Sequence, residues 1–146
     1  KVDNLSLNEE QKKHVNTLFN MITDIERVGD HADNLSENAR YLINNNLTFS
    51  DLAVEDLKDI TENSLNAFET ALNAEGKNSL QVVRDVNKFE DKVDMLEDEL
   101  REKHIERLSK GECIPQAGII FLDIISNLER VSDHATNIAG YLKSEM

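Results

Sequence analysis

The chain of 146 residues lacks tryptophan, and it has one cysteine, one proline, five glycines and only 5% aromatic residues. So little proline and glycine leaves few breaks for a many-stranded fold. The single thiol, Cys113, excludes an intrachain disulfide, and the reducing cytosol is its simplest setting. No apolar run approaches the ~20 residues of a membrane span, because Asp123 interrupts the longest one.

Basic residues are also scarce, with 16 Lys and Arg against 29 Asp and Glu and a formal net charge of −13. An acidic surface repels phosphate backbones, so we expect no nucleic-acid partner. It also disfavours direct adsorption to anionic membranes. The charge is compatible with cation binding, and no signal-peptide pattern is visible.

Apolar residues recur every three or four positions, which predicts an all-α fold of long amphipathic helices. Three consecutive asparagines from Asn44 end the first helix. Ser50 and Ser79 are candidate N-caps of the second and third, and Gly76 is the candidate C-terminal glycine of the second. We expect the helices at about 8–45, 51–76, 80–109 and 116–143.

Short connections between long helices favour an antiparallel, up-down bundle of four helices, with residues 1–146 forming one domain. The periodicity also predicts which residues face the core. In the first helix these are Leu18, Met21, Ile25, Val28, Ala32, Leu35, Ala39 and Leu42; in the second, Leu57, Ile60, Leu65, Phe68 and Leu72; in the third, Val82, Val86, Phe89, Val93, Leu96 and Leu100; and in the fourth, Val131, Ala135 and Ile138.

One charged motif occurs twice. The segment ITDIERVGDHADN at 22–34 aligns without gaps to ISNLERVSDHATN at 125–137, with eight of 13 positions identical. Two unrelated amphipathic helices would share apolar spacing, but they would not readily share Glu-Arg-Val-x-Asp-His-Ala. We therefore expect the first and fourth helices to be one element used twice.

Each copy separates into an apolar seam and an acidic stripe. At roughly 100° per residue, Glu26 and Asp30 lie within about 40° of each other, and Val28 lies on the opposite side. The third helix carries a related pair. Glu-x-x-x-Asp therefore occurs at Glu26 and Asp30, at Glu90 and Asp94, and at Glu129 and Asp133.

Like charges one turn apart destabilise a helix by about 0.2–0.5 kcal/mol, and a bound cation would reverse that cost. Two such carboxylates can ligate a metal together, and several helices can contribute to one cluster. Carboxylate and imidazole ligands suit Fe, Mn, Zn or Mg, among which the sequence does not choose. The structural alternative is an acidic face that is merely solvated.

Other polar residues lie near the acidic pairs. His31 and His134 lie about 140° around the helix from the glutamates, which favours an interhelical hydrogen bond over metal ligation. Asp33 is matched by Thr136 in the second copy, so it is a weaker ligand candidate. The accessory candidates are Asp33, Asn34, Glu97, Asn137, His31 and His134.

The sequence argues against an enzyme. Helical-bundle enzymes with two metals use Glu-x-x-His, but the residues three before the four histidines are Gln11, Val28, Arg101 and Val131. No nucleophile–His–acid arrangement and no phosphate-binding glycine loop is apparent. A helical interaction module without catalytic activity is the expectation that remains at this point.

The repeated ERVGDHADN and ERVSDHATN, together with EDKVDMLEDEL in the third helix, resemble the hallmarks of the PhoU family of phosphate-uptake regulators. The resemblance implies three-helix repeats with surface metal clusters held by Glu/Asp-x-x-x-Asp motifs. Iron and zinc are the metals it favours, with manganese and magnesium as alternatives. The metal ligands it implies are Glu26, Asp30, Glu90, Asp94, Glu129 and Asp133.

The chain departs from a free-standing PhoU, which has two complete repeats. Helices two to four resemble one repeat, and helix one resembles the last helix of a preceding repeat, so the first metal site is expected to lack partner acids. PhoU-like domains also form cytoplasmic tails of bacterial Na⁺/phosphate cotransporters, and a start at Lys1 without Met suits such a tail.

The main functional expectation is therefore a metal-binding domain that controls phosphate uptake from the cytoplasmic side of the membrane. Its partners would be the transmembrane region of the same chain or a phosphate-signalling protein, with a homodimer as a further option. The alternatives are a free-standing PhoU-like regulator and a plain helical interaction module without metal.

Overall fold

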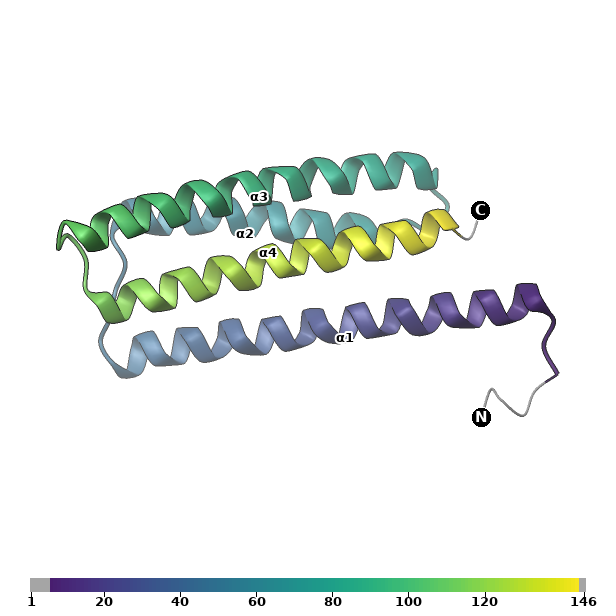
Figure 1. Cartoon of the computed structure of the whole chain (residues 1–146), viewed down its shortest axis with the longest axis horizontal. Coiled ribbons are helices and arrows are strands. Elements are labelled where there is room, and N and C mark those ends of the chain that lie inside the picture. The colour runs from purple at the N-terminus through teal and green to yellow at the C-terminus, as the bar shows by residue number, and fades with distance from the viewer. Residues whose placement is uncertain (1–5, 145–146) are drawn as a thin grey trace.

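The computed structural model describes residues 6–144 as four helices (Figure 1). They are α1 (Glu9–Asn44), α2 (Asp51–Leu72), α3 (Ser79–Ser109) and α4 (Pro115–Ser144). The expected all-α bundle of four helices is confirmed, and the bounds differ from the predicted ones by four residues at most.

Polar side chains cap the N-termini of the first three helices. They accept hydrogen bonds from backbone amides that have no partner within the helix. Asn8 and Gln11 form a reciprocal capping box at α1. Ser50 caps α2 as expected, with its Oγ accepting from the amide of Ala53 at 3.1 Å. The expectation for Ser79 is wrong, because Asn78 caps α3 and Ser79 is its first helical residue.

The asparagine run ends α1 as expected, and Asn46 takes a left-handed conformation with φ 51°. Gly76 does not end α2, which stops at Leu72 with Asn73 as its C-cap. Gly76 instead has φ 75° in the connection to α3, a conformation that residues with a Cβ rarely adopt.

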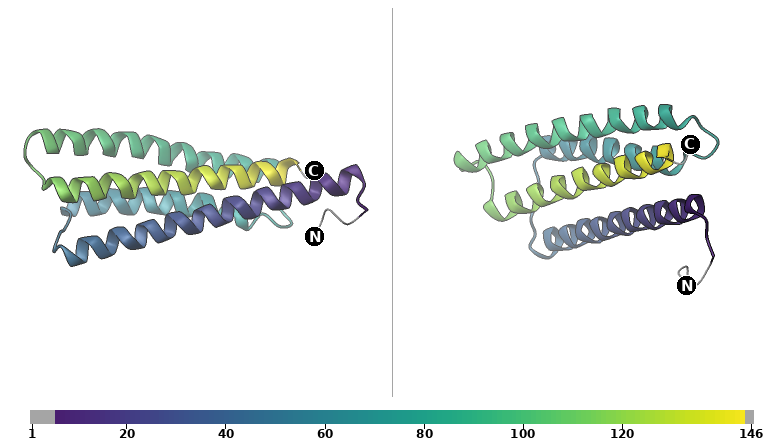
Figure 2. Two further views of the ribbon diagram at one scale, coloured as in Figure 1. Left: turned by 60° about the horizontal axis from the view of Figure 1, so that its bottom comes forward. Right: turned by 45° about the vertical axis from the view of Figure 1, so that its right-hand side comes forward.

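Helix α4 is central to the arrangement. It packs closely against each of the other helices, while α2 and α3 also pack against each other. Among the described residues, the backbone of α1 approaches only α4. Figures 1 and 2 show α1 alongside α4, opposite the α2–α3 pair, with its start extending past the end of α4. The fold is thus a three-helix bundle with a fourth helix on one side.

The buried core lies inside the α2–α3–α4 unit and consists of two clusters. Ser64 lies on α2 between the core residues Ile60 and Ala67, and its Oγ donates to the carbonyl of Leu128 at 2.7 Å. One cluster contains Ala53, Ile60, Val93, Leu96, Leu100, Phe121, Ile125 and Leu128. The other contains Ala67, Ala71, Ala74, Val82, Val86, Ala135, Ile138 and Ala139.

The core residues predicted for α3 and α4 are buried or half-buried, but the predictions for α1 and α2 need correction. On α1, Leu18 and Ile25 are 45% and 41% exposed, and Ala32 and Ala39 are exposed as well, because α1 has one close neighbour. The α2 seam uses small residues in place of the exposed side chains of Leu65 and Leu72. The small residues of that seam are Ala53, Ser64, Ala67 and Ala71.

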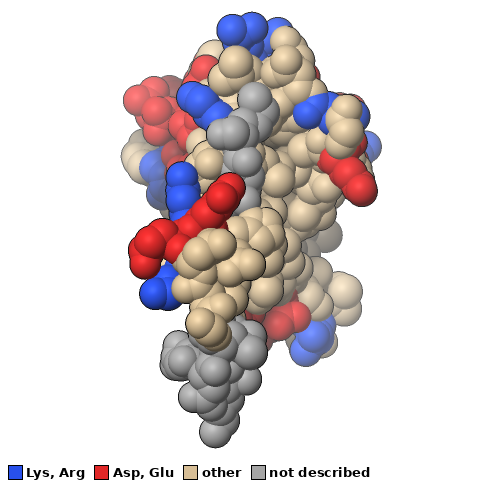
Figure 3. Space-filling view, turned by 90° about the vertical axis from the view of Figure 1, so that its right-hand side faces the viewer, with Lys and Arg blue, Asp and Glu red and all other residues tan. Residues whose placement is uncertain are grey.

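Charged side chains cover much of the surface. Figure 3 views the end at which α1 begins and α4 ends, where acidic and basic groups both surround a central uncharged region. Within residues 6–144, no helix combines the length and the apolarity needed to cross a membrane.

Two glycines of α4 test the packing described here. A Cβ at Gly118 would lie 2.6 Å from Nε2 of His104, a buried ring that stacks on Phe121 and cannot move cheaply. A Cβ at Gly140 would meet nothing within 4 Å. We expect Gly118→Ala to lower the free energy of unfolding by about 1–3 kcal/mol. Gly140→Ala should raise it by about 0.5–1 kcal/mol through helix propensity.

Urea denaturation followed by circular dichroism measures both changes. Equal effects of the two substitutions would contradict the close packing of α3 against the start of α4.

Candidate metal centre

The two copies of the repeated motif lie side by side on antiparallel helices, one on α1 and the other on α4. Because α4 also packs against α3, the second copy has an acidic neighbour that the first copy lacks. The acidic pairs of α3 and α4 therefore meet.

The meeting point is a group of three carboxylates, Glu90 and Asp94 on α3 and Asp133 on α4. One oxygen from each lies within 4.8 Å of the others, and all three side chains are half-buried. Among the described residues, this is the only group of three or more Asp, Glu, His or Cys side chains with such spacing. The i,i+4 spacing on α3 and the antiparallel pairing with α4 produce it.

Glu129 is the fourth member of the site. It lies one turn before Asp133 on the same helix, and the two side chains are hydrogen-bonded. The pKa of Glu129 is raised to about 7. Burial is the largest cause, and the hydrogen bond to Asp133 and repulsion from Asp133, Asp94 and Glu97 raise it further. A carboxylic acid with this pKa is about half protonated at pH 7.

Glu90 shows the same behaviour on α3. Burial raises its pKa to about 7, helped by the charge of Asp94, a hydrogen bond to Asp94 and the charge of Asp133. Burial also raises the pKa of Asp94, although its hydrogen bond with Glu90 acts in the opposite direction. The raised pKa values of Glu90, Asp94 and Glu129 show that the cluster disfavours full ionisation of these groups.

This donor set fits a metal ion. All its ligand atoms are carboxylate oxygens, which suit Mg, Mn, Fe and Zn. Gathering four acids in one half-buried place raises the free energy of their ionised forms. A bound cation would replace bound protons and remove that repulsion.

Glu97 lies at the edge of the cluster, where Arg101 engages it. The guanidinium of Arg101 donates to Glu97 at 3.0 Å through Nε and to the hydroxyl of Ser126 on α4 at 2.9 Å. This salt bridge pairs Glu97 with a cation, so the cluster is bounded by a guanidinium on this side. Glu97 therefore lies beside the four carboxyl groups, and its accessory role at a metal stays a prediction.

The first copy is arranged differently. Glu26, Asp30 and Asp33 are exposed on α1, and no group of three potential ligands forms around them in the described part of the chain. The structure thus brings together Glu90, Asp94 and Asp133, with Glu129 hydrogen-bonded beside them, and leaves Glu26 and Asp30 apart.

Both histidines make the interhelical hydrogen bonds that were expected. Nδ1 of His31 lies 3.0 Å from Oδ1 of Asn127, and Nδ1 of His134 lies 2.7 Å from Oδ1 of Asp24. The two imidazole rings stack between the helices, with centroids 5.4 Å apart and planes inclined by 25°. In both cases Nδ1 is engaged by the opposite helix.

Sequence reasoning missed Asp24 and Asn127, which are buried and occupy equivalent positions of the two copies. Asp24 also accepts from the amide of Asn137 at 3.1 Å, and Asn127 accepts from the amide of Asn34 at 3.2 Å. The two asparagines named as accessory candidates thus use their amides between helices. A polar residue in the same place of both copies was the available signal.

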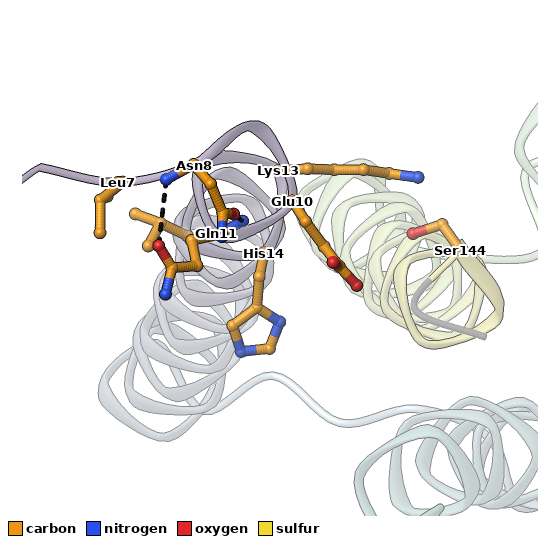
Figure 4. A pocket seen from close by; sticks show the side chains of 8 residues that line it. Leu7, Asn8, Glu10, Gln11, Lys13, His14 and Ser144 are labelled. Carbon is orange, nitrogen blue, oxygen red and sulfur yellow. Dashed lines mark hydrogen bonds between the residues drawn. The ribbon is translucent and has the colours of Figure 1, made fainter.

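Two cavities lie away from the acidic pairs. One of about 660 Å³ lies between the start of α1 and the end of α4, where the side chain of Glu10 extends toward Ser144 (Figure 4). Another of about 360 Å³ contains His104 and Cys113, whose Nε2 and Sγ atoms are 3.9 Å apart. Neither cavity is lined by a residue of the acidic pairs.

The raised pKa values predict an unusual pH dependence for the metal-free protein. Glu90 and Glu129 hold protons in the folded state that the unfolded chain loses above pH 4.5, so stability falls as the pH rises through about 7. We expect Glu129→Gln to stabilise the metal-free protein by about 1 kcal/mol at pH 8, after allowance for solvent screening. The exposed counterpart, Glu26→Gln, should change stability by less than about 0.5 kcal/mol.

Denaturant unfolding in chelator at pH 5.5 and pH 8 measures these differences. If Glu129→Gln destabilised the metal-free protein at pH 8, the repulsion inferred for the cluster would be absent.

Comparisons with known proteins identify the family of the chain. A family model described as the PhoU domain matches residues 54–142. The chain is 28% identical over 128 residues to the phosphate-specific transport system accessory protein PhoU homolog 1 of Thermotoga maritima. The alignment covers 88% of this chain but only 54% of that relative, so the chain spans about half its length. No solved structure matches the chain. The family match covers most of the three-helix unit that holds the acidic cluster, and the chain belongs to the PhoU family.

Proposed function

We propose that the chain is a metal-binding regulator of phosphate transport that acts by binding other proteins and has no catalytic activity. The cluster formed by Glu90, Asp94 and Asp133 with Glu129 carries the proposal, because it lies within the matched PhoU domain. Iron or zinc would occupy the cluster, with manganese or magnesium as alternatives.

The relative supports the regulatory part of the proposal. Its name describes an accessory protein of a phosphate-specific transport system. This favours a free-standing regulator over a cytoplasmic tail of a Na⁺/phosphate cotransporter, which rests on the motif resemblance alone. The partners would be components of the phosphate transport or signalling system on the cytoplasmic side of the membrane.

The repeat provides a matched pair of variants. The double substitution Asp94→Ala/Asp133→Ala removes acids from the α3–α4 cluster, whereas Glu26→Ala/Asp30→Ala removes the exposed pair of α1. We expect the first variant to lose bound metal and the second to retain it. Inductively coupled plasma mass spectrometry of protein reconstituted with Fe or Zn and dialysed measures the metal content.

Wild-type protein without stoichiometric metal would favour the plain helical interaction module. Metal lost only from Glu26→Ala/Asp30→Ala would place the site on α1 and contradict the proposed α3–α4 cluster. The same two variants test regulation in cells of the source organism. We expect cells with Asp94→Ala/Asp133→Ala to lose control of phosphate uptake, as cells with the gene deleted do. Cells with Glu26→Ala/Asp30→Ala should keep most of that control. Unchanged uptake in the deletion strain would argue against a role in phosphate transport.

A further inference from the structure

Asp24 is a buried carboxylate that connects α1 to three successive turns of α4. Its side chain is 8% exposed, and Oδ1 accepts hydrogen bonds from Nδ1 of His134 and Nδ2 of Asn137. Tyr141 lies one turn further on, where burial and then the charge of Asp24 raise the pKa of its phenol. One side chain of α1 thus fixes one face of α4.

The fixed face is next to the acidic face. His134 follows Asp133 directly, so the two side chains point about 100° apart around α4. His134 contacts α1, and Asp133 faces the carboxylates of α3. The rotation of α4 about its own axis therefore determines both contacts at once.

Metal sites tolerate little error in that rotation. Side chains extend roughly 5–6 Å from a helix axis, so a 10° rotation moves a carboxylate by about 1 Å. Metal–ligand distances vary by only about 0.2 Å. The apolar contacts of α4 with α2 and α3 are not directional, whereas the hydrogen bonds to Asp24 are.

The repeat shows which property of Asp24 matters. Asn127 occupies the equivalent position in the second copy and contacts His31 and Asn34 in the same way. A carboxamide oxygen therefore serves as well as a carboxylate in this place. The shared feature is a hydrogen-bond acceptor aimed at the histidine of the opposite helix.

We propose that Asp24 is a positioning residue for the metal site between α3 and α4, acting through its hydrogen bonds to His134 and Asn137. The inference rests on the proposed metal binding and extends it to a helix that contributes no member of the cluster. It makes α1 part of the metal-binding unit.

Titration calorimetry with Zn²⁺ tests the inference. We expect Asp24→Ala to weaken Zn²⁺ binding by about 10-fold, the lower end of the range for outer-shell substitutions. Asp24→Asn should stay within about 3-fold of wild type, because the amide oxygen keeps the hydrogen bond. The absorption spectrum of the Co²⁺-loaded protein should change with Asp24→Ala and return with Asp24→Asn.

Asn38→Ala is the matched control for a general loosening of α1. Asn38 is buried on α1 and donates to Asp123 of α4 at 3.0 Å, about 15 Å along α4 from Asp133 at ~1.5 Å per residue. We expect this variant to lose stability while keeping Zn²⁺ affinity. Equal losses of affinity in Asp24→Ala and Asn38→Ala, or none in Asp24→Ala, would overturn the inference.

Two further variants keep the outcomes distinct. If Asp24→Ala does not fold, Asn137→Ala removes one of the two hydrogen bonds more gently and should still weaken binding. Asp133→Ala should abolish binding at the cluster. If Asp133→Ala binds Zn²⁺ as well as wild type does, the proposed metal function fails and the inference fails with it. If Asp133→Ala loses binding while Asp24→Ala keeps it, only the inference fails.

Discussion

The rotational setting of α4 is the constraint on which the rest of the structure depends. This helix packs against all three others, and each contact uses a different kind of side chain. Apolar residues such as Ile125 and Ile138 face the core, His134 faces α1, and Asp133 faces the acids of α3. The sequence of α4 satisfies these contacts in one orientation only, so fixing one face places the others.

The acidic cluster opposes this packing. Bringing Glu90, Asp94, Glu129 and Asp133 together at a half-buried position raises the pKa of Glu90 and Glu129 to about 7. Packing and the α1–α4 hydrogen bonds hold these groups together despite their repulsion. Such an arrangement is costly for a merely solvated surface, and a cation that replaces the protons turns the repulsion into binding energy.

Much of the fold could be predicted from the sequence because helix boundaries are set locally. The asparagine run ends α1 and Ser50 begins α2, both as expected. The facing acids follow from i,i+4 spacing on adjacent helices. The buried faces of α1 and α2 were predicted only in part, because periodicity finds an apolar stripe but not its neighbour. Val28 and Ile60 are buried as expected. Leu18 is thus exposed, and Asp24 was missed because its partner lies 110 residues away.

Anomalous diffraction from crystals of the Zn²⁺-loaded protein tests the central claim most directly, because it locates the metal without reference to affinity. The account predicts zinc between α3 and α4, with carboxylate oxygens of Asp94 and Asp133 at about 2.0–2.2 Å. Zinc found only at Glu26 and Asp30, or no zinc at the α3–α4 cluster, would contradict it.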